Sequence, residues 1–248
     1  MLTLLAIETS TSLASVALLR NGEIHTRESQ GVHTHSQVIL PMVQELLVEA
    51  GATLAQCDAI AFGAGPGSFT GVRTACGIAQ GLGYGGNLPV VPVVTLEAMA
   101  EACRELNGAN DVLTVMDAAM GEVYWARYRY LGQAMGGWQP VVEPRLSSPA
   151  DVYAQGDGQT DVLANTLACG NGLATYATAF EGRIFVQTAL ANILPHARQI
   201  ARLGAEAFSQ GKAVRVHDAQ PFYLRNKVAY TTAERAELAA QQLTKVCG

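Results

Sequence analysis

The sequence predicts an α/β protein made of two related halves, and three observations carry this prediction. Two similar stretches begin the halves, with Glu8 in the first lying over Asp117 in the second, 109 positions later. Between them, short apolar segments alternate with patterns of helical period. The chain of 248 residues is 49% hydrophobic and only 15% charged, so it can bury a large core.

Each half opens on a short apolar strand that ends in an acidic residue. The stretch L-L-A-I-E ends at Glu8, and the stretch L-T-V-M-D ends at Asp117. A turn of small or hydroxyl residues follows the acid in the first copy, and A-A-M-G follows it in the second. A second segment then alternates apolar and polar residues, as a half-buried strand does. A glycine turn leads on to a third extended segment in both copies. We therefore expect each half to begin with a three-strand antiparallel meander.

The remaining elements follow from the hydrophobic periods and the glycine and proline positions. In the first half we expect a helix at 36–50, a strand at 58–63, a helix at 70–82, a strand at 90–94 and a helix at 96–107. The second half is less regular, and there we expect a strand near 161–168 and helices near 196–209 and 232–244. The boundary near Asn107 to Asp111 gives lobes at 1–107 and 108–248, and the terminal helices could pack back on the first lobe.

Two halves that each open with an acid-tipped hairpin suggest the actin-like, RNase H-like architecture. In that architecture the two acidic turns face each other across a cleft that holds phosphates and a metal ion. The other interpretation is that Glu8 and Asp117 are capped turn residues. The topology alone leaves both interpretations open.

Composition excludes several classes of protein. A formal net charge of −5 provides no field that would attract nucleic acid. Five scattered cysteines without a C-x-x-C pair indicate a reducing compartment, hence the cytoplasm, and argue against a disulfide framework or a zinc site. The longest uncharged run, at 74–96, is interrupted by glycines and prolines, so we expect no membrane span. The low charge fits either extra surface buried against another protein or a closely packed monomer.

The glycine-rich stretch G-A-G-P-G-S-F-T-G-V-R at 63–73 resembles a phosphate loop but lacks its chemistry. It has no lysine for a Walker A loop, and Pro66 stands where a nucleophile elbow needs glycine. The helix that follows carries two lanes of small residues, Gly71/Ala75/Ala79 and Thr74/Gly77/Gly81. Interior glycine costs a helix roughly 1 kcal/mol, so close approach to a neighbour must compensate. We expect one lane to face the sheet and the other a partner.

Five motifs, in this order and spacing, resemble the TsaB (YeaZ) family: I-E-T-S, H-S-Q-V-I-L-P-M, G-P-G-S-F-T-G-V-R, M-D-A-A-M-G-E-V-Y-W-A and P-F-Y-L-R-N-K-V-A. That family is the dimerisation subunit of the bacterial tRNA threonylcarbamoyladenosine transferase complex. The resemblance implies an actin-like fold in two lobes and partnership with the catalytic paralogue TsaD and the ATPase TsaE. The complex transfers a threonylcarbamoyl group from threonylcarbamoyl-AMP to N6 of the adenosine beside the anticodon, in tRNAs that read codons starting with A.

The resemblance also implies roles for individual residues. It implies no catalytic residue, and a vestigial cleft at Glu8, Thr9, Asp117, Gly121 and Gly170. The five histidines form no H-x-x-x-H pair, so we expect no metal site, with ATP and metal held by partner subunits. We expect Arg225 to be structural or at the partner edge. The predicted partner interface consists of His35, Leu40, Val43, Leu47, Phe69, Gly71, Arg73, Thr74, Ala75, Gly77, Ile78, Ala79 and Gly81.

The function that we expect is a non-catalytic scaffold and activating subunit. It would bind TsaD and TsaE, form a homodimer when alone, and meet tRNA only through the complex. The alternative is an actin-like small-molecule kinase or ATPase, which should carry an acid beside a glycine-rich phosphate turn. A protease would need a nucleophile–base pair or a metal site, and the sequence shows neither.

Overall fold

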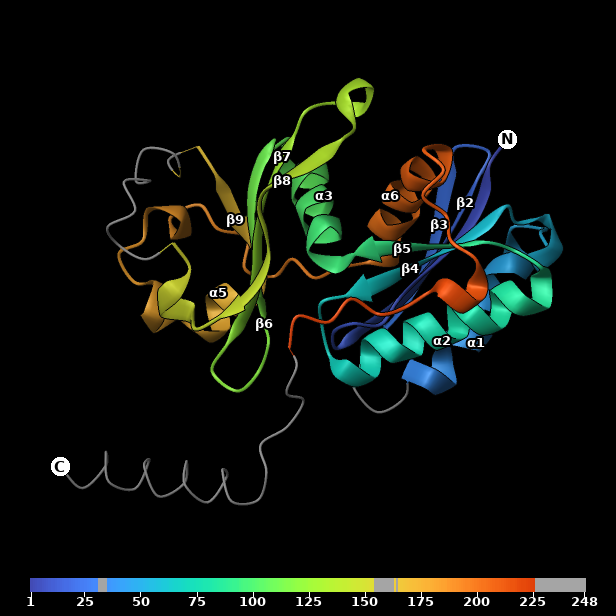
Figure 1. Ribbon diagram of the computed structural model, residues 1–248, viewed down its shortest axis with the longest axis horizontal. Helices are drawn as coiled ribbons and strands as arrows, with labels where there is room; N and C mark the ends of the chain where they lie inside the picture. The colour runs from blue at the N-terminus through green and yellow to red at the C-terminus, as the bar shows by residue number, and fades with distance from the viewer. Residues whose placement is uncertain (31–34, 154–162, 164, 226–248) are drawn as a thin grey trace, which may run out of the picture.

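The structure, a computed structural model, describes residues 1–30, 35–153, 163 and 165–225. The expected helix at 232–244 lies outside these residues, as do positions 161, 162 and 164 of the expected strand at 161–168. Within them, the chain forms two mixed sheets with helices packed around the first sheet and between the two (Figure 1).

The first sheet has the strand order β3-β2-β1-β4-β5. Its first three strands are consecutive and antiparallel, with Glu8 opposite Ser15 at the end of the first pair. The other two run parallel to β1. All six residues of β1 are buried, because the sheet is covered by helices on both faces. The bounds are β1 Thr3–Glu8, β2 Leu13–Arg20, β3 Glu23–Gln30, β4 Ala59–Gly65 and β5 Val90–Val94.

The second sheet repeats this plan with the order β8-β7-β6-β9. Strands β6, β7 and β8 are again consecutive and antiparallel, and β9 lies parallel to β6. Asp117 ends β6 as Glu8 ends β1, and it pairs with Val123. The bounds are β6 Asp111–Asp117, β7 Val123–Tyr130, β8 Trp138–Ser147 and β9 Leu167–Cys169.

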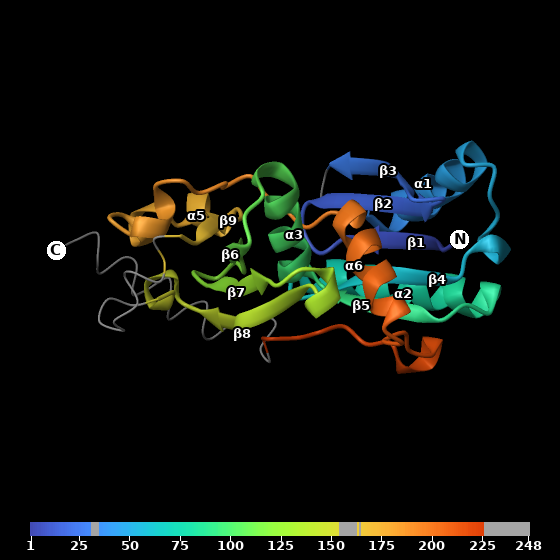
Figure 2. The same ribbon diagram turned by 90° about the horizontal axis from the view of Figure 1, so that it is seen from above.

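Helices α1 and α2 cover one face of the first sheet, and α6 covers the other (Figures 1 and 2). Helix α3 lies between the two sheets and packs against both. The helices are α1 His35–Glu49, α2 Phe69–Gly86, α3 Thr95–Asn107, α5 Gly172–Thr175 and α6 Ala197–Ser209. Short 3-10 turns lie at Leu54–Gln56, Gln133–Met135, Pro149–Asp151, Ala177–Phe180, Ile184–Val186 and Val216–Asp218.

Helix α6 belongs spatially to the first lobe, although it comes after the second sheet in the chain. A side chain at Gly204 would place its Cβ 2.5 Å from the Cβ of Ala61 on β4, so the helix lies directly on the strand. Further along, Val214 pairs with Val90 at the edge of the same sheet. The chain therefore crosses to the second sheet near 108 and returns to the first near 195.

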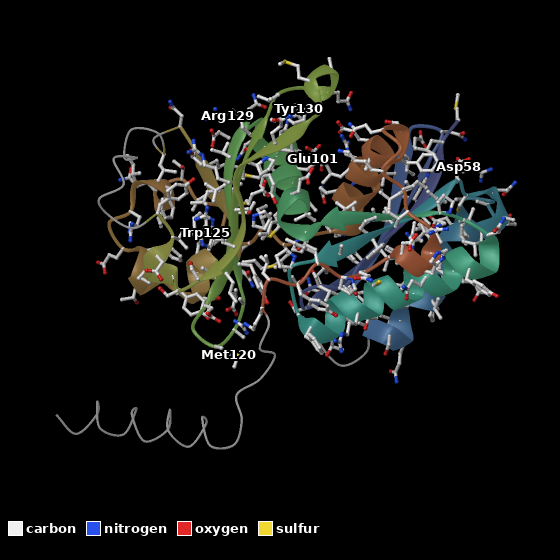
Figure 3. The ribbon with its side chains drawn as sticks, viewed as in Figure 1. Asp58, Glu101, Met120, Trp125, Arg129 and Tyr130 are labelled. Atoms are coloured by element: carbon white, nitrogen blue, oxygen red, sulfur yellow. The ribbon has the colours of Figure 1, made fainter. Side chains whose placement is uncertain are left out.

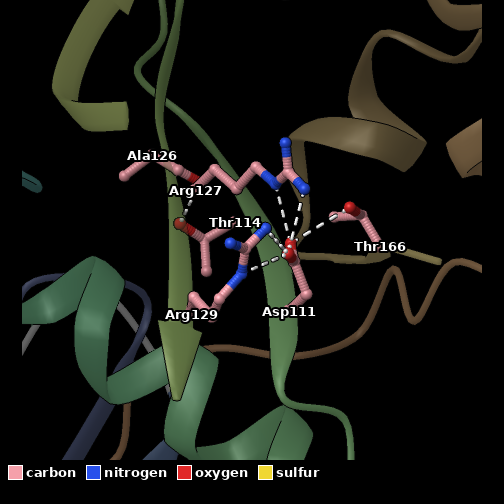
Figure 4. Close-up of polar contacts among 6 residues, drawn as sticks. All are labelled: Asp111, Thr114, Ala126, Arg127, Arg129 and Thr166. Carbon is pink, nitrogen blue, oxygen red and sulfur yellow. Dashed lines mark hydrogen bonds and ion pairs between the residues drawn. The ribbon is translucent and has the colours of Figure 1, made fainter. Parts of the chain in front are cut away.

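A buried ion-pair network fixes the start of the second sheet (Figure 4). Asp111 accepts hydrogen bonds from Arg127 at 2.7 and 2.9 Å, from Arg129 at 2.9 Å and from Thr166 at 3.0 Å. Burial alone would raise the pKa of Asp111, but the hydrogen bonds from Arg127 and Arg129 outweigh it and the pKa is lowered. Arg127 is 2% exposed, and a charge so deeply buried needs these partners.

Helix α2 is seated on the turn after β1 by its first lane of small residues. A Cβ at Gly71 would lie 2.0 Å from the carbonyl oxygen of Thr9, while the Thr9 hydroxyl donates to the Gly71 carbonyl at 2.7 Å. Ala75 and Ala79 are fully buried beneath the same helix. At Gly77, in contrast, a Cβ would have nothing within 4 Å. The lane at 71, 75 and 79 is thus the inner one, and the lane at 74, 77 and 81 faces outward.

Two alanine substitutions in this one helix should therefore act in opposite directions. Gly71→Ala pushes a methyl group into the Thr9 backbone and should lower the free energy of unfolding by about 3 kcal/mol. Gly77→Ala meets open space and should raise it by up to about 1 kcal/mol. Denaturant unfolding of both variants checks this; equal effects at the two positions would show that α2 is not seated as described.

Candidate functional site

Helices α1 and α2 present an apolar face on the side away from the sheet. Leu40 is 49% exposed and Val48 is 73% exposed on α1, and Tyr84 is 85% exposed near the end of α2. Between the two helices lies a groove of about 320 Å³, and Gln44 is the one polar side chain among the described residues that line it. Exposed apolar side chains gathered around a groove are typical of surfaces that bind another protein. The groove is lined by Leu40, Val43, Gln44, Leu47, Val48, Ala52, Leu54 and Leu82.

The outward lane of α2 makes the neighbouring surface flat. Gly77 and Gly81 are exposed and carry no side chain, and Thr74 is half-buried with its hydroxyl bonded to the Thr70 carbonyl at 2.9 Å. The backbone of an opposing helix can approach such a strip more closely than it can approach larger side chains. In a monomer these exposed helix glycines would lower stability relative to alanine, and no close contact would compensate for the loss.

The predicted interface residues divide into two sets. Val43, Gly71, Ala75 and Ala79 are buried. The last three hold α2 against the rest of its own lobe, whereas Val43 also lines the groove. The other nine are exposed or half-exposed on α1 and α2: His35, Leu40, Leu47, Phe69, Arg73, Thr74, Gly77, Ile78 and Gly81. Val48 and Tyr84 are also strongly exposed on this face, although they are not among the predicted interface residues.

A cleft of about 960 Å³ separates the two lobes. The turn after β1, the first turn of α2, the turn after β6 and residues 222–225 form its walls. Met120, in the turn after β6, is one of the lining residues and is labelled in Figure 3. Its lining mixes serine and threonine hydroxyls with the side chains of Phe69, Met116 and Tyr124.

Asp117 lines this cleft, but its carboxylate already has protein partners. Its Oδ1 accepts hydrogen bonds from the Tyr176 hydroxyl and the Ala119 amide, both at 2.8 Å. Its own amide donates to Asn171 at 3.0 Å. Asp117 therefore acts as a capped turn residue, the second of the two interpretations. Tyr176 and Asn171 were missed, because each lies more than fifty positions away and neither has a local sequence signal.

Glu8 does not face the cleft, contrary to expectation. It is 0% exposed; Oε1 accepts a hydrogen bond from the Ser10 amide, and Oε2 has no hydrogen-bond partner among the described residues. The carboxyl group lies against Gly63, where a Cβ would be 1.7 Å from Oε2. Burial raises the pKa of Glu8 to about 7, and hydrogen bonds from Ser10 and Thr9 oppose that rise.

Of the five predicted cleft residues, only Asp117 lines the cleft. The Thr9 hydroxyl is used in seating α2, and Gly170 permits close approach to the backbone of β6, where a Cβ would be 2.1 Å from the Val115 carbonyl oxygen. Gly121 has a φ of +78° and belongs to the turn itself. At these positions the structure shows contacts and backbone conformations that shape the fold.

The described part of the chain offers neither a metal site nor a membrane span. No group of three or more His, Cys, Asp or Glu side chains there could hold a metal ion. None of the helices there is long and apolar enough to cross a membrane.

Comparison with known proteins places these features in a family. Residues 17–240 match the family described as "TsaD: tRNA N6-adenosine threonylcarbamoyltransferase". A Haemophilus influenzae protein named "tRNA threonylcarbamoyladenosine biosynthesis protein TsaB" is 39% identical over 234 residues, covering 92% of this chain and 96% of its own length. The Escherichia coli K12 protein of the same name is 37% identical over 227 residues, with the same coverage.

The chain belongs to the TsaB (YeaZ) family. A solved structure titled "YeaZ from Pseudomonas aeruginosa" is similar over 90% of this chain and 100% of its own, with a TM-score of 0.79 and 39% identity. A second Pseudomonas aeruginosa structure, of an "uncharacterized protein with similarity to peptidase YEAZ", gives a TM-score of 0.81 over 91% of this chain, also at 39% identity. The expected α/β fold of the actin-like, RNase H-like class is confirmed for this TsaB-family chain.

The buried carboxyl group makes a prediction about pH. Because the pKa of Glu8 is raised in the folded state, the folded protein binds this proton more tightly than the unfolded chain does. The associated stability is complete below about pH 4.5 and is lost as the pH rises through about 7. Glu8→Gln should therefore change stability little at pH 5 and raise it at pH 8 by up to about 3 kcal/mol.

Denaturant unfolding at the two pH values measures this effect. Glu45→Gln, which removes the same charge from an exposed position on α1, should leave the difference between the two pH values unchanged. Burial also raises the pKa of Glu97 to about 7, so some pH dependence should remain in Glu8→Gln. A Glu8→Gln protein that loses as much stability between pH 5 and 8 as the wild type would contradict the assignment.

Proposed function

We propose that this chain is a non-catalytic scaffold and activating subunit in the biosynthesis of tRNA threonylcarbamoyladenosine. The reaction served would be transfer of a threonylcarbamoyl group to N6 of the adenosine beside the anticodon, in tRNAs that read codons starting with A. The names of the Haemophilus influenzae and Escherichia coli relatives support the pathway. The observation that carries the scaffold role is the apolar face of α1 and α2 with its open strip at Gly77 and Gly81.

The proposed partner at this face is the catalytic paralogue, TsaD. Residues 17–240 match the TsaD family, so the paralogue shares this fold and has counterparts of α1 and α2. A contact of these helices with their counterparts would be approximately symmetric, like the isologous contact of a homodimer. The chain alone would then pair with a second copy through the same face, and the paralogue would replace that copy. The ATPase TsaE would join the assembled pair.

The non-catalytic role is supported by the two acids at the hairpin turns. One is buried against Gly63, and the other is hydrogen-bonded within its own turn, so neither is placed to hold a metal–nucleotide complex. ATP and metal would be bound by the partner subunits. With a net charge of −5 the chain offers little attraction for tRNA by itself, so tRNA contact would come through the complex. The compartment would be the cytoplasm.

Two arginine substitutions on α2 separate an outer surface from the core. Gly77→Arg should give a folded protein that is monomeric and no longer binds the paralogue. A charge buried without a partner costs several kcal/mol, enough to break a micromolar contact worth about 8 kcal/mol. Ala75→Arg, on the inner lane, should prevent folding.

Sedimentation velocity, a thermal melt and capture of the purified paralogue measure these outcomes. Ser209→Arg is the matched control, because it adds the same charge at an exposed site on α6, on the opposite face of the sheet. Wild-type association of the folded Gly77→Arg protein would overturn the assignment of this face.

Activity assays with each subunit omitted test the non-catalytic role. The pure chain should show neither threonylcarbamoyl transfer nor magnesium-dependent ATP hydrolysis, and transfer by TsaD and TsaE should require its addition. The alternative, an actin-like kinase or ATPase, predicts turnover that co-purifies with the chain and disappears in Asp117→Ala. That result would replace the scaffold proposal.

A further inference from the structure

Residues 219–225 form an extended segment that runs from the first lobe to the second along the cleft, drawn in red in Figure 1. We call this segment the strap. The chain also crosses between the two sheets near 108 and near 195, so the strap is a further crossing, close to the end of the described residues. Unlike the other two crossings, it lines the cleft, through Phe222, Tyr223, Leu224 and Arg225.

On the first lobe, the strap is held by its backbone. The Phe222 amide donates to the Ala64 carbonyl at 2.7 Å, at the end of β4. Gly65, with a φ of +116°, allows the Phe222 carbonyl to approach so closely that a Cβ would lie 2.7 Å from it. At its start, the Ala219 carbonyl accepts a hydrogen bond from Gln80 on α2 at 3.0 Å. These contacts join the strap to both β4 and α2.

A second contact joins the strap to the exposed end of α2. Arg73 Nε donates to the Tyr223 hydroxyl at 2.7 Å, and its guanidinium lies 3.6 Å from the centre of the Phe69 ring. The rings of Phe69 and Tyr223 are 5.8 Å apart. Arg73 remains exposed on the side of α2 that carries the outward lane, so it belongs to both the proposed partner face and the strap contacts.

On the second lobe, the strap ends in an ion pair. Arg225 Nη2 lies 2.6 Å from Glu122 Oε2, and the two side chains are 14% and 39% exposed. The same nitrogen donates to the Ala119 carbonyl at 3.4 Å. Glu122 and Ala119 belong to the turn that follows Asp117 at the end of β6, so the strap contacts the wall of the cleft opposite α2.

We propose that the strap couples the partner-facing end of α2 to the second lobe, so that a protein bound at Arg73 changes the closure of the cleft. A partner that accepts hydrogen bonds from the Arg73 guanidinium competes with Tyr223 for it. Release of Tyr223 removes one of the contacts that hold the strap between α2 and Glu122. By thermodynamic reciprocity, a change in the cleft alters affinity at the α2 face. The partner half of this proposal rests on the proposed function; the link through the strap does not.

Amide hydrogen exchange of the full chain tests the link: the exchange rate is measured in one lobe after a substitution has removed a strap contact on the other lobe. Arg225→Gln should speed exchange of the Val72 amide, in the first turn of α2, by roughly tenfold. Arg73→Gln should speed exchange of the Glu122 amide, across the cleft, by a similar factor. Arg215→Gln is the matched control: it breaks the exposed ion pair of Arg215 with Asp218, which lies just before the strap, within one 3-10 turn of the first lobe.

The link is overturned if Val72 in Arg225→Gln and Glu122 in Arg73→Gln both exchange at wild-type rates. If Arg225→Gln does not fold, Glu122→Gln breaks the same ion pair from its more exposed side, and the same Val72 readout applies.

Affinity for the partner tests the other half. Arg225→Gln, which lies outside the α1–α2 face, should change affinity for the paralogue several-fold. A paralogue that binds wild type and Arg225→Gln equally would overturn this half of the proposal. If the paralogue binds neither the wild-type chain nor its variants, the proposed function is contradicted, and the exchange result still tests the link through the strap.

Discussion

Helix α2 lies so close to the turn after β1 that position 71 has room only for a hydrogen atom. This contact fixes the rotation of the helix about its axis, because the Thr9 hydroxyl also binds the Gly71 carbonyl. With Gly71 facing inward, Ala75 and Ala79 fall beneath the helix and Gly77 and Gly81 fall on its outer side. The apolar face next to α1, the contact of Arg73 with the strap and the shape of the cleft wall all depend on that rotation.

The glycine-rich stretch before α2 serves the same constraint. Its glycines lie against other parts of the backbone or against buried side chains: Gly63 against Glu8, Gly65 against Phe222 and Gly67 against Ser10. At each of these three positions a Cβ atom would collide with its neighbour, so only glycine permits the contact. The stretch is therefore a packing device that brings the first hairpin, α2 and the strap together.

The sequence predicts the regular part of this fold well because local patterns determine it. The repeated strand ending in an acid marks the start of both sheets, and the helical periods locate α1, α2, α3 and α6 to within a few residues. The features that the sequence did not predict depend on contacts between residues far apart in the chain. Burial of Glu8 depends on Gly63, and the capping of Asp117 depends on Tyr176 and Asn171. The two lanes of α2 are equally small, so only the position of Thr9 shows which of them faces inward.

The central claim is that the outer face of α1 and α2 binds the paralogue. Hydroxyl-radical footprinting of the full chain, alone and in the presence of the paralogue, tests it at the level of side chains. Leu40, Val48 and Tyr84 are all strongly exposed and should be oxidised in the free chain and protected in the complex. Met135, 66% exposed on the second lobe, should remain reactive in both. Protection of Met135 with continued oxidation of Leu40 and Tyr84 would place the partner elsewhere and contradict the account.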